Sequence, residues 1–213
     1  ITGITNGGLF QSDGTTAINE GDFITFAQAN AGLKFTPAAN SIANGSFSVQ
    51  ASTSNGVGGL GGGTATATIT ITPIADAPSV TDATTSEDTQ STSGLVISRN
   101  AADGTEVTHF QITGITNGTL FQNDGTTAIG NGDFISFAQG NAGLKFTPAA
   151  NSIANGSFSV QSSTSNVVSG LGGGTATATI TVTPIADTPS VTDATTNEDT
   201  QSTSGLVISR NAA

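Results

Sequence analysis

Apolar and polar residues alternate with a period of two along much of the chain. The clearest case runs from Thr175 to Thr183, where Ala, Ile and Val take the even positions and Thr the odd ones. A period of two places the apolar residues on one face of a β-strand and the threonines on the other. The same alternation occurs in GSFSVQS at 156–162 and in THFQIT at 108–113. No segment has a convincing helical period, so the pattern predicts an all-β protein.

The chain also repeats itself. ITGITNGGLFQSDGTTAI at Ile1 returns as ITGITNGTLFQNDGTTAI at Ile112, which gives a period of 111 residues (112 − 1). Residues 1–102 align without gaps on 112–213 with twelve differences, most of them small polar exchanges at turns. A unit of this length is the size of a whole domain, so each copy is expected to have its own core.

Turn signals separate the strands of each unit. Asp124-Gly125 lies between two apolar segments and predicts a tight hairpin, while Asn131-Gly132 and Asn155-Gly156 mark further turns. Seven short strands in about 100 residues are typical of a two-sheet Greek-key β-sandwich. The strands of the second copy are predicted near residues 94–99, 106–115, 118–122, 133–138, 143–147, 156–164 and 174–184.

Prolines mark the predicted boundaries between units. Pro184 to Pro189 closes one unit as Pro73 to Pro78 closes the unit before it, and so short a linker favours a semi-rigid array. The chain then divides into residues 1–77, a repeat without its first strands, 78–188, a complete repeat, and 189–213, the first strands of a further repeat.

This division suggests that strands are exchanged between molecules. A sandwich without its first strands has unpaired edges. Two periods would be 222 residues, nine more than the 213 of the chain. The nine residues that occur only once are Asp103 to Gln111. We hypothesise that the C-terminal segment of one molecule completes the N-terminal unit of the next, in a head-to-tail contact that need not close. The alternative is that the chain was cut from a longer protein, or that flanking residues are disordered.

Composition narrows the classes of function. Nucleic-acid binding needs clustered Lys and Arg, and an anionic membrane would repel a chain of net charge −11. The chain has no Cys, which excludes a disulfide scaffold and a zinc–cysteine site. No apolar run approaches the roughly 18 residues of a membrane-spanning helix. Only 9% of residues are charged, and the four basic ones are Lys34, Arg99, Lys145 and Arg210.

Signals for catalysis and nucleotide binding are weak, so an enzyme is not predicted. His109 is the only histidine; it falls on the strand face opposite Phe110 and is expected at the surface, which argues against a Ser-His-Asp triad. Gly56 to Gly61 matches GxGxxG but precedes a strand, and the second copy loses the match, so the segment is interpreted as a flexible loop. A glycosidase needs two carboxylic acids that face each other across a cleft. Several acids of this chain instead lie beside turn glycines and give no evidence of a cleft: Asp13, Asp22, Asp124 and Asp133.

Four stretches carry a resemblance to a known family: TATITITPIADAP (Thr66 to Pro78), SEDTQ (Ser86 to Gln90), ADGTEVTHFQIT (Ala102 to Thr113) and GLKFTPAANSIANGSFSVQ (Gly143 to Gln161). Through them the unit resembles the bacterial cadherin-like and Ig-like tandem repeats of very large secreted adhesins and biofilm-associated proteins, over the entire chain. The resemblance implies extracellular display, a β-sandwich, passive spacing between an anchor and a binding tip, and in some members calcium at domain junctions. The DxD and DRE-like motifs of animal cadherins are absent.

Calcium is the cofactor that the resemblance implies. The ion takes six to eight oxygen ligands, several of them from carboxylates. The alternative is that the acidic residues near the ends of the units are solvated turn and capping residues, which Asp favours in loops. The candidate metal ligands are Asp76, Glu87, Asp88, Asp103, Asp187, Glu198 and Asp199.

The leading interpretation is structural. The chain is expected to be a spacer or stalk of an extracellular bacterial adhesin at the cell surface, which mediates cell or biofilm adhesion by extending a binding tip. Its expected partners are neighbouring repeats of the same chain and, head to tail, further copies of itself; neither nucleic acid nor membrane insertion is expected. The alternative is an adhesive or carbohydrate-binding repeat that contacts ligand directly and could self-associate with calcium. Such sites usually expose aromatic residues, and here the only aromatic residue is Phe, mostly on inward faces.

Overall fold

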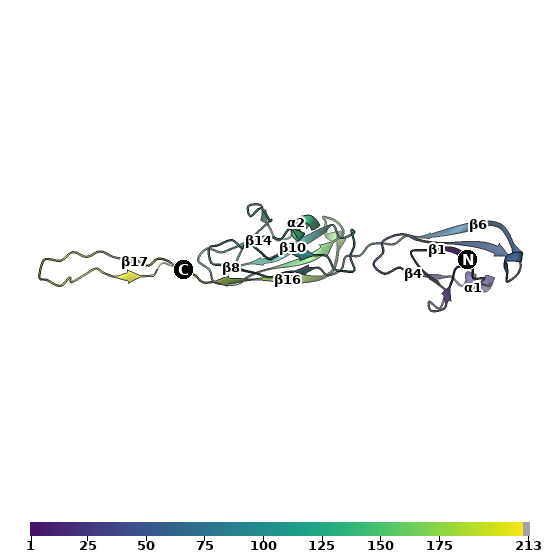
Figure 1. The fold of residues 1–213 in the computed structure, drawn as a ribbon, viewed down its shortest axis with the longest axis horizontal. Coiled ribbons are helices and arrows are strands. Elements are labelled where there is room, and N and C mark those ends of the chain that lie inside the picture. Colours follow the sequence, from purple (N-terminus) through teal and green to yellow (C-terminus); the bar gives the residue numbers. More distant parts are fainter. Residues whose placement is uncertain (211–213) are drawn as a thin grey trace. The chain divides into compact units, whose positions relative to one another are not determined.

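The structure, a computed structural model, describes residues 1–210 and is almost entirely β (Figure 1). It divides into two compact units: unit 1 is residues 1–74 with 101–106, and unit 2 is residues 75–100 with 107 onward. In both units the sheets contribute the core-facing side chains. The all-β sandwich predicted from the alternation is confirmed.

Unit 1 has two three-stranded sheets, with strand orders β1-β5-β6 and β3-β2-β4. All of their pairings are antiparallel. A short 3-10 turn, Val57–Gly59, leads into the last strand. The elements are β1 (Thr2–Thr5), β2 (Gly7–Phe10), β3 (Ala17–Ile18), α1 (Phe26–Asn30), β4 (Lys34–Pro37), β5 (Gly45–Ser52) and β6 (Leu60–Ile69).

Unit 2 has a five-stranded sheet, β13-β10-β15-β16-β8, a three-stranded sheet, β12-β11-β14, and a two-stranded pair, β7-β9. A second 3-10 turn, Val168–Gly170, precedes its last long strand. The elements are β7 (Ser79–Val80), β8 (Ala83–Ser86), β9 (Ile97–Ser98), β10 (His109–Thr116), β11 (Gly118–Phe121), β12 (Ala128–Ile129), β13 (Phe134–Ser136), α2 (Phe137–Asn141), β14 (Lys145–Pro148), β15 (Gly156–Ser163) and β16 (Leu171–Thr183).

Two further strands, β17 (Ser190–Val191) and β18 (Ile208–Ser209), pair with each other in a long hairpin. Elements of the two units recur at the sequence period. For example, β2 and β11 begin 111 positions apart (118 − 7), and so do β5 and β15 (156 − 45).

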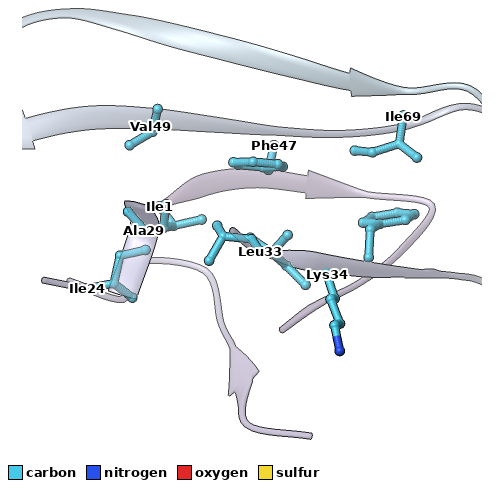
Figure 2. A pocket seen from close by; sticks show the side chains of 10 residues that line it. Ile1, Ile24, Ala29, Leu33, Lys34, Phe47, Val49 and Ile69 are labelled. Atoms are coloured by element: carbon cyan, nitrogen blue, oxygen red, sulfur yellow. The ribbon is translucent and has the colours of Figure 1, made fainter. Parts of the chain in front are cut away.

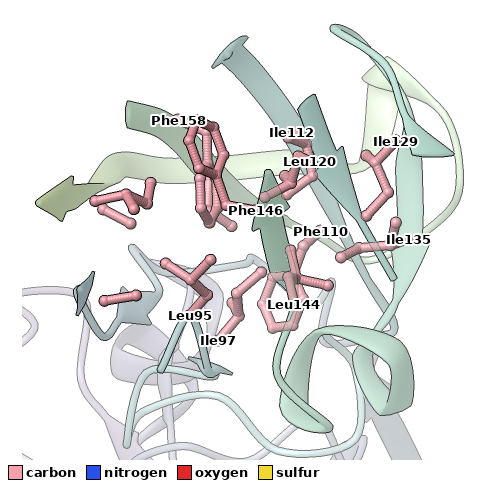
Figure 3. Close-up of a cluster of buried hydrophobic side chains, with 14 of the residues drawn as sticks. Leu95, Ile97, Phe110, Ile112, Leu120, Ile129, Ile135, Leu144, Phe146 and Phe158 are labelled. Atoms are coloured by element: carbon pink, nitrogen blue, oxygen red, sulfur yellow. The ribbon is translucent and has the colours of Figure 1, made fainter. Parts of the chain in front are cut away.

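The core of unit 2 lies between its five-stranded and its three-stranded sheet, and Figure 3 shows it at close range. Phe110 of β10 and Phe158 of β15 point inward from one sheet, and Leu120 of β11 and Phe146 of β14 from the other. All four side chains are fully buried. In β16 the even positions from Ala178 are buried and the Thr positions between them exposed, as the alternation predicted.

Within residues 75–183 all seven predicted strands are present, together with three short ones, β7, β8 and β12. The Asp124-Gly125 hairpin is confirmed, although a loop of residues 122–127 joins its two strands rather than a tight two-residue turn. The expectation of no helix is wrong for α1 and α2, each five residues long. Across residues 1–210, no helix combines the length and the apolar character that crossing a bilayer requires.

Candidate functional site

Two of the predicted calcium ligands, Glu87 and Asp88, accept hydrogen bonds from backbone N–H groups within unit 2. Glu87 is buried, and its Oε1 accepts a hydrogen bond from the Ile185 backbone N–H at 2.5 Å, while its Oε2 is buried without a hydrogen-bond partner. Asp88 Oδ1 accepts from the Asn151 backbone N–H at 2.8 Å. Both carboxylates therefore fasten the segment that carries β8 to loops of the sandwich.

The other five candidates have different surroundings. Asp103 belongs to unit 1 and is half-buried, and four others are exposed: Asp76, Asp187, Glu198 and Asp199. Among residues 1–210, no three or more His, Cys, Asp or Glu side chains gather in a group that could hold a metal ion. Calcium binding stays a prediction, which would require six to eight oxygen ligands around the ion.

His109, the only histidine of the sequence, has a hydroxyl neighbour. It is half-buried on β10, with its Nδ1 2.8 Å from Thr108 Oγ1, while the neighbouring Phe110 points into the core. The Gly56 to Gly61 segment runs through a 3-10 turn into β6, so it precedes a strand, as predicted.

The strongest candidate site is an open apolar pocket in unit 1, with a volume of about 340 Å³ (Figure 2). In the view of Figure 2, Phe47 lies on one side of the opening and Leu33 on the other. Lys34 is its only charged lining residue. The lining residues are Ile1, Leu9, Ile24, Ala29, Leu33, Lys34, Phe35, Phe47, Val49 and Ile69.

The pocket is a core without its cover. Shifted by 111 positions, eight of its ten lining residues correspond to members of the closed core of unit 2. Val49 is 40% exposed, whereas its counterpart Val160 is 0% exposed. Phe35 is half-buried, whereas Phe146 is fully buried. The sequence predicted unpaired strands in unit 1 but not this pocket. The pocket is recognised because residues that are identical in the two copies differ in burial.

In unit 2 the corresponding opening is covered by residues 75–98. Leu95 and Ile97 from this segment are 0% exposed and lie beside Leu144 in the core (Figure 3). Ser91 fixes the segment to β14: its backbone N–H donates to Phe146 O at 2.8 Å, and the Phe146 N–H donates to Ser91 Oγ at 2.9 Å. The two units therefore differ in whether this side of the core is covered.

Comparison of the chain with protein-family models and with curated proteins gave no match.

Proposed function

We propose that the repeated unit is a structural spacer of an extracellular bacterial adhesin, which holds a binding tip away from the cell. The observation that carries the proposal is the identity of the core in the two copies. Ten members of the unit 2 core have a counterpart in residues 1–102, and all ten counterparts are identical. A chain that copies a complete fold unchanged gains length, whereas a chain selected for chemistry would be expected to diversify its sites.

The exposed faces support the same proposal. Thr177, Thr179 and Thr181 lie on the outer side of β16, so the surface there is polar but uncharged. Few cations and a net charge of −11 favour solubility and disfavour adhesion to other anionic surfaces. Extracellular display and the adhesin context come from the resemblance of the repeat and belong to the proposal.

A test changes the number of units. One additional copy of residues 78–188, inserted after Thr188, preserves every local junction because Pro78 then takes the place of Pro189. With a binding domain of known affinity fused to Ile1 and the other end attached to a surface, the spacer role predicts that the reach of that domain increases while its affinity is unchanged. Neutron reflectometry measures the reach. A reach that does not change with the number of units would contradict the proposal.

A glycan array tests the alternative function. The spacer role predicts no specific binding by the chain, whereas saturable binding to one class of glycan would favour a repeat that contacts ligand directly. The proposal does not require calcium. If calcium raises the unfolding temperature and EDTA reverses the rise, the proposed spacer would also bind calcium.

A further inference from the structure

Six Asn-Gly pairs occur in the sequence, and this combination of residues has a reactivity of its own. The backbone nitrogen of the glycine can attack the side-chain amide carbon of the asparagine, because glycine has no side chain that hinders the approach. A folded structure controls this reaction by holding or releasing the two groups. The pairs begin at Asn6, Asn44, Asn55, Asn117, Asn131 and Asn155.

Four of the pairs are held at the beginning of strands, and hydrogen bonds fix their asparagine side chains. Asn117 Nδ2 donates to Asn155 O at 2.8 Å, and Asn155 Oδ1 accepts from the Val182 N–H at 3.1 Å. The same two hydrogen bonds form around Asn6 and Asn44 in unit 1. An attack by the glycine nitrogen would first have to break these contacts. The glycines of these pairs are the first residues of β2, β5, β11 and β15.

The fifth pair, Asn131-Gly132, is held in a loop. Asn131 Oδ1 accepts a hydrogen bond from the Ile115 N–H at 2.9 Å, and the Gly132 N–H donates to Ile112 O at 2.7 Å. Both reacting groups, the side-chain amide and the backbone nitrogen, are therefore engaged. Each hydrogen bond that has to break slows the reaction by roughly two- to tenfold.

The sixth pair, Asn55-Gly56, has neither restraint. The carbonyl oxygen of Gly56 accepts hydrogen bonds from Ser52 Oγ at 3.2 Å and from the Gly59 N–H at 3.1 Å. Neither the Asn55 side chain nor the Gly56 N–H takes part in a hydrogen bond among residues 1–210. Asn55 is also exposed, so solvent water reaches its side chain.

This exposure belongs to the loop itself and does not depend on the open side of unit 1. Unit 2 has the same loop: the Thr53 N–H donates to Gly59 O, and the Thr164 N–H to Gly170 O, both at 2.9 Å. Asn166, the counterpart of Asn55, is exposed in unit 2, although the core of that unit is closed.

The two loops differ at the residue that follows the asparagine. Gly56 follows Asn55, whereas Val167 follows Asn166. The branched side chain of Val is stiff and crowds its own backbone nitrogen, which hinders the approach to the asparagine side chain. The chain therefore contains a reactive loop and an unreactive copy of it.

We propose that Asn55 is a site of spontaneous modification, at which the chain converts its own asparagine to aspartate and isoaspartate. The Gly56 nitrogen forms a bond to Asn55 Cγ and gives up its proton. The bond from Cγ to Nδ2 breaks, and the amide nitrogen leaves as ammonia with that proton. The product is a five-membered succinimide ring.

Water then opens the ring. Its hydroxyl adds to one of the two ring carbonyl carbons, and its second hydrogen goes to the ring nitrogen as the bond between that carbon and the nitrogen breaks. Opening at Cγ gives aspartate, and opening at the backbone carbonyl carbon gives isoaspartate, in which the main chain continues through Cβ and Cγ. Either acid ionises at neutral pH and adds a negative charge to the loop, without oxidation or reduction.

The modification makes two nearly identical units chemically different with time. A carboxylate accumulates in the loop of unit 1, while the copy around Asn166 stays uncharged. The extent of conversion therefore records the age of the chain. The inference concerns this loop alone and does not rest on the spacer function.

Peptide mapping by mass spectrometry tests the proposal on the unmodified chain, incubated at neutral pH in water enriched in heavy oxygen. Asn55 should take up the label roughly tenfold or more faster than Asn131, because two hydrogen bonds restrain the second site. A methyltransferase specific for isoaspartate should label the same peptide. No conversion at Asn55, or conversion that is as fast at any of the other five pairs, would overturn the proposal.

Two variants exchange the residue that distinguishes the loops. Gly56→Val should abolish the conversion of Asn55, and a Cβ at position 56 would meet nothing within 4 Å, so the loop accommodates the change. Val167→Gly should make Asn166 react about as fast as Asn55, since Val167 is half exposed and its loop is otherwise alike. Conversion that persists in the first variant, or stays absent in the second, would refute the assignment.

Unfolding in urea separates the effect of the structure from that of the sequence. All six pairs are then released from their hydrogen bonds, so the lead of Asn55 over Asn131 should disappear. If Asn55 keeps the same lead in the unfolded chain, the restraints described here are not what selects the site, and the proposal fails.

Discussion

At the scale of single residues, two glycines leave room for the buried ring of Phe146. A Cβ on Gly118 would lie 2.4 Å, and one on Gly156 2.3 Å, from Phe146 Cζ. The ring therefore approaches the backbone closely at β11 and at the start of β15. Gly7 and Gly45 face Phe35 in the same way in unit 1. These glycines are needed for packing and not for turns.

Gly156→Ala is expected to destabilise unit 2 by about 1–3 kcal/mol, because the methyl group overpacks a filled core. Chemical denaturation followed by circular dichroism measures the change. Gly174→Ala is the control, since a Cβ there would meet only Ala77 Cβ at 3.9 Å. Equal effects of the two substitutions would contradict the packing argument.

Asp124 is a residue whose ionisation is tied to the structure of its loop. The Thr127 hydroxyl and then the backbone N–H groups of Thr127 and Thr126 donate to its carboxylate and lower its pKa from 3.8 to about 2. A lowered pKa stabilises the folded loop above the unfolded value, and this contribution is lost as the pH falls from about 3.8 to about 2.

Thr127→Val should raise the pKa of Asp124 toward 3.8, because it removes the hydroxyl donor and leaves the backbone donors. Carboxyl-carbon NMR titration measures the shift. Asp13 has the same arrangement with Thr16 and Thr15 and a pKa of about 2, and it should be unchanged in the variant. An unchanged Asp124 would show that the backbone donors alone account for the shift.

At the scale of elements, burial separates two copies of one strand. Ile97 of β9 is 0% exposed and Ile208 of β18 is 75% exposed, although their sequence surroundings are the same. Ile97→Ala should lower the stability of unit 2 by about 2–5 kcal/mol through the lost burial and the cavity left behind. Ile208→Ala at low protein concentration should leave the unfolding of unit 2 unchanged. Urea titration of both variants makes the comparison, and a similar loss in both would contradict the assigned burial.

Long alternating strands could be predicted from the sequence, whereas the short elements could not. β15 and β16 extend over eight and thirteen residues, enough for a period of two to be recognised. β7 and β12 have two residues each, and no period can appear in so few. α2 also escapes a periodicity argument, but its capping box was visible as Ser136 followed three residues later by Gln139.

The candidate site could be anticipated only in part, because burial depends on contacts distant in sequence. The repeat pointed to unpaired strands in unit 1, but the exposure of Val49 depends on whether a segment such as 75–98 covers it. The acidic residues were predicted from their place near the ends of the units. Glu87 and Asp88 instead bind backbone N–H groups of residues that are distant in the chain, Ile185 and Asn151.

At the scale of the whole molecule, the two units should differ in stability. Apolar burial is the main stabilising contribution to folding, and the core of unit 1 is open where that of unit 2 is closed. Calorimetry should therefore resolve two transitions, with unit 1 unfolding at the lower temperature. A single transition for both units would contradict the difference in burial.

The parallel pairing of β8 with β16 has a mechanical consequence. β8 begins at Ala83 and β16 ends at Thr183, close to the two ends of the repeat 78–188, and they run side by side from Ala83–Ile180 to Ser86–Thr183. Tension applied to the two ends in opposite directions slides these strands past each other, so their hydrogen bonds carry the load together and do not open one after another. A tether made from such units would hold under a steady pull and yield only when that whole row of bonds gives way at once.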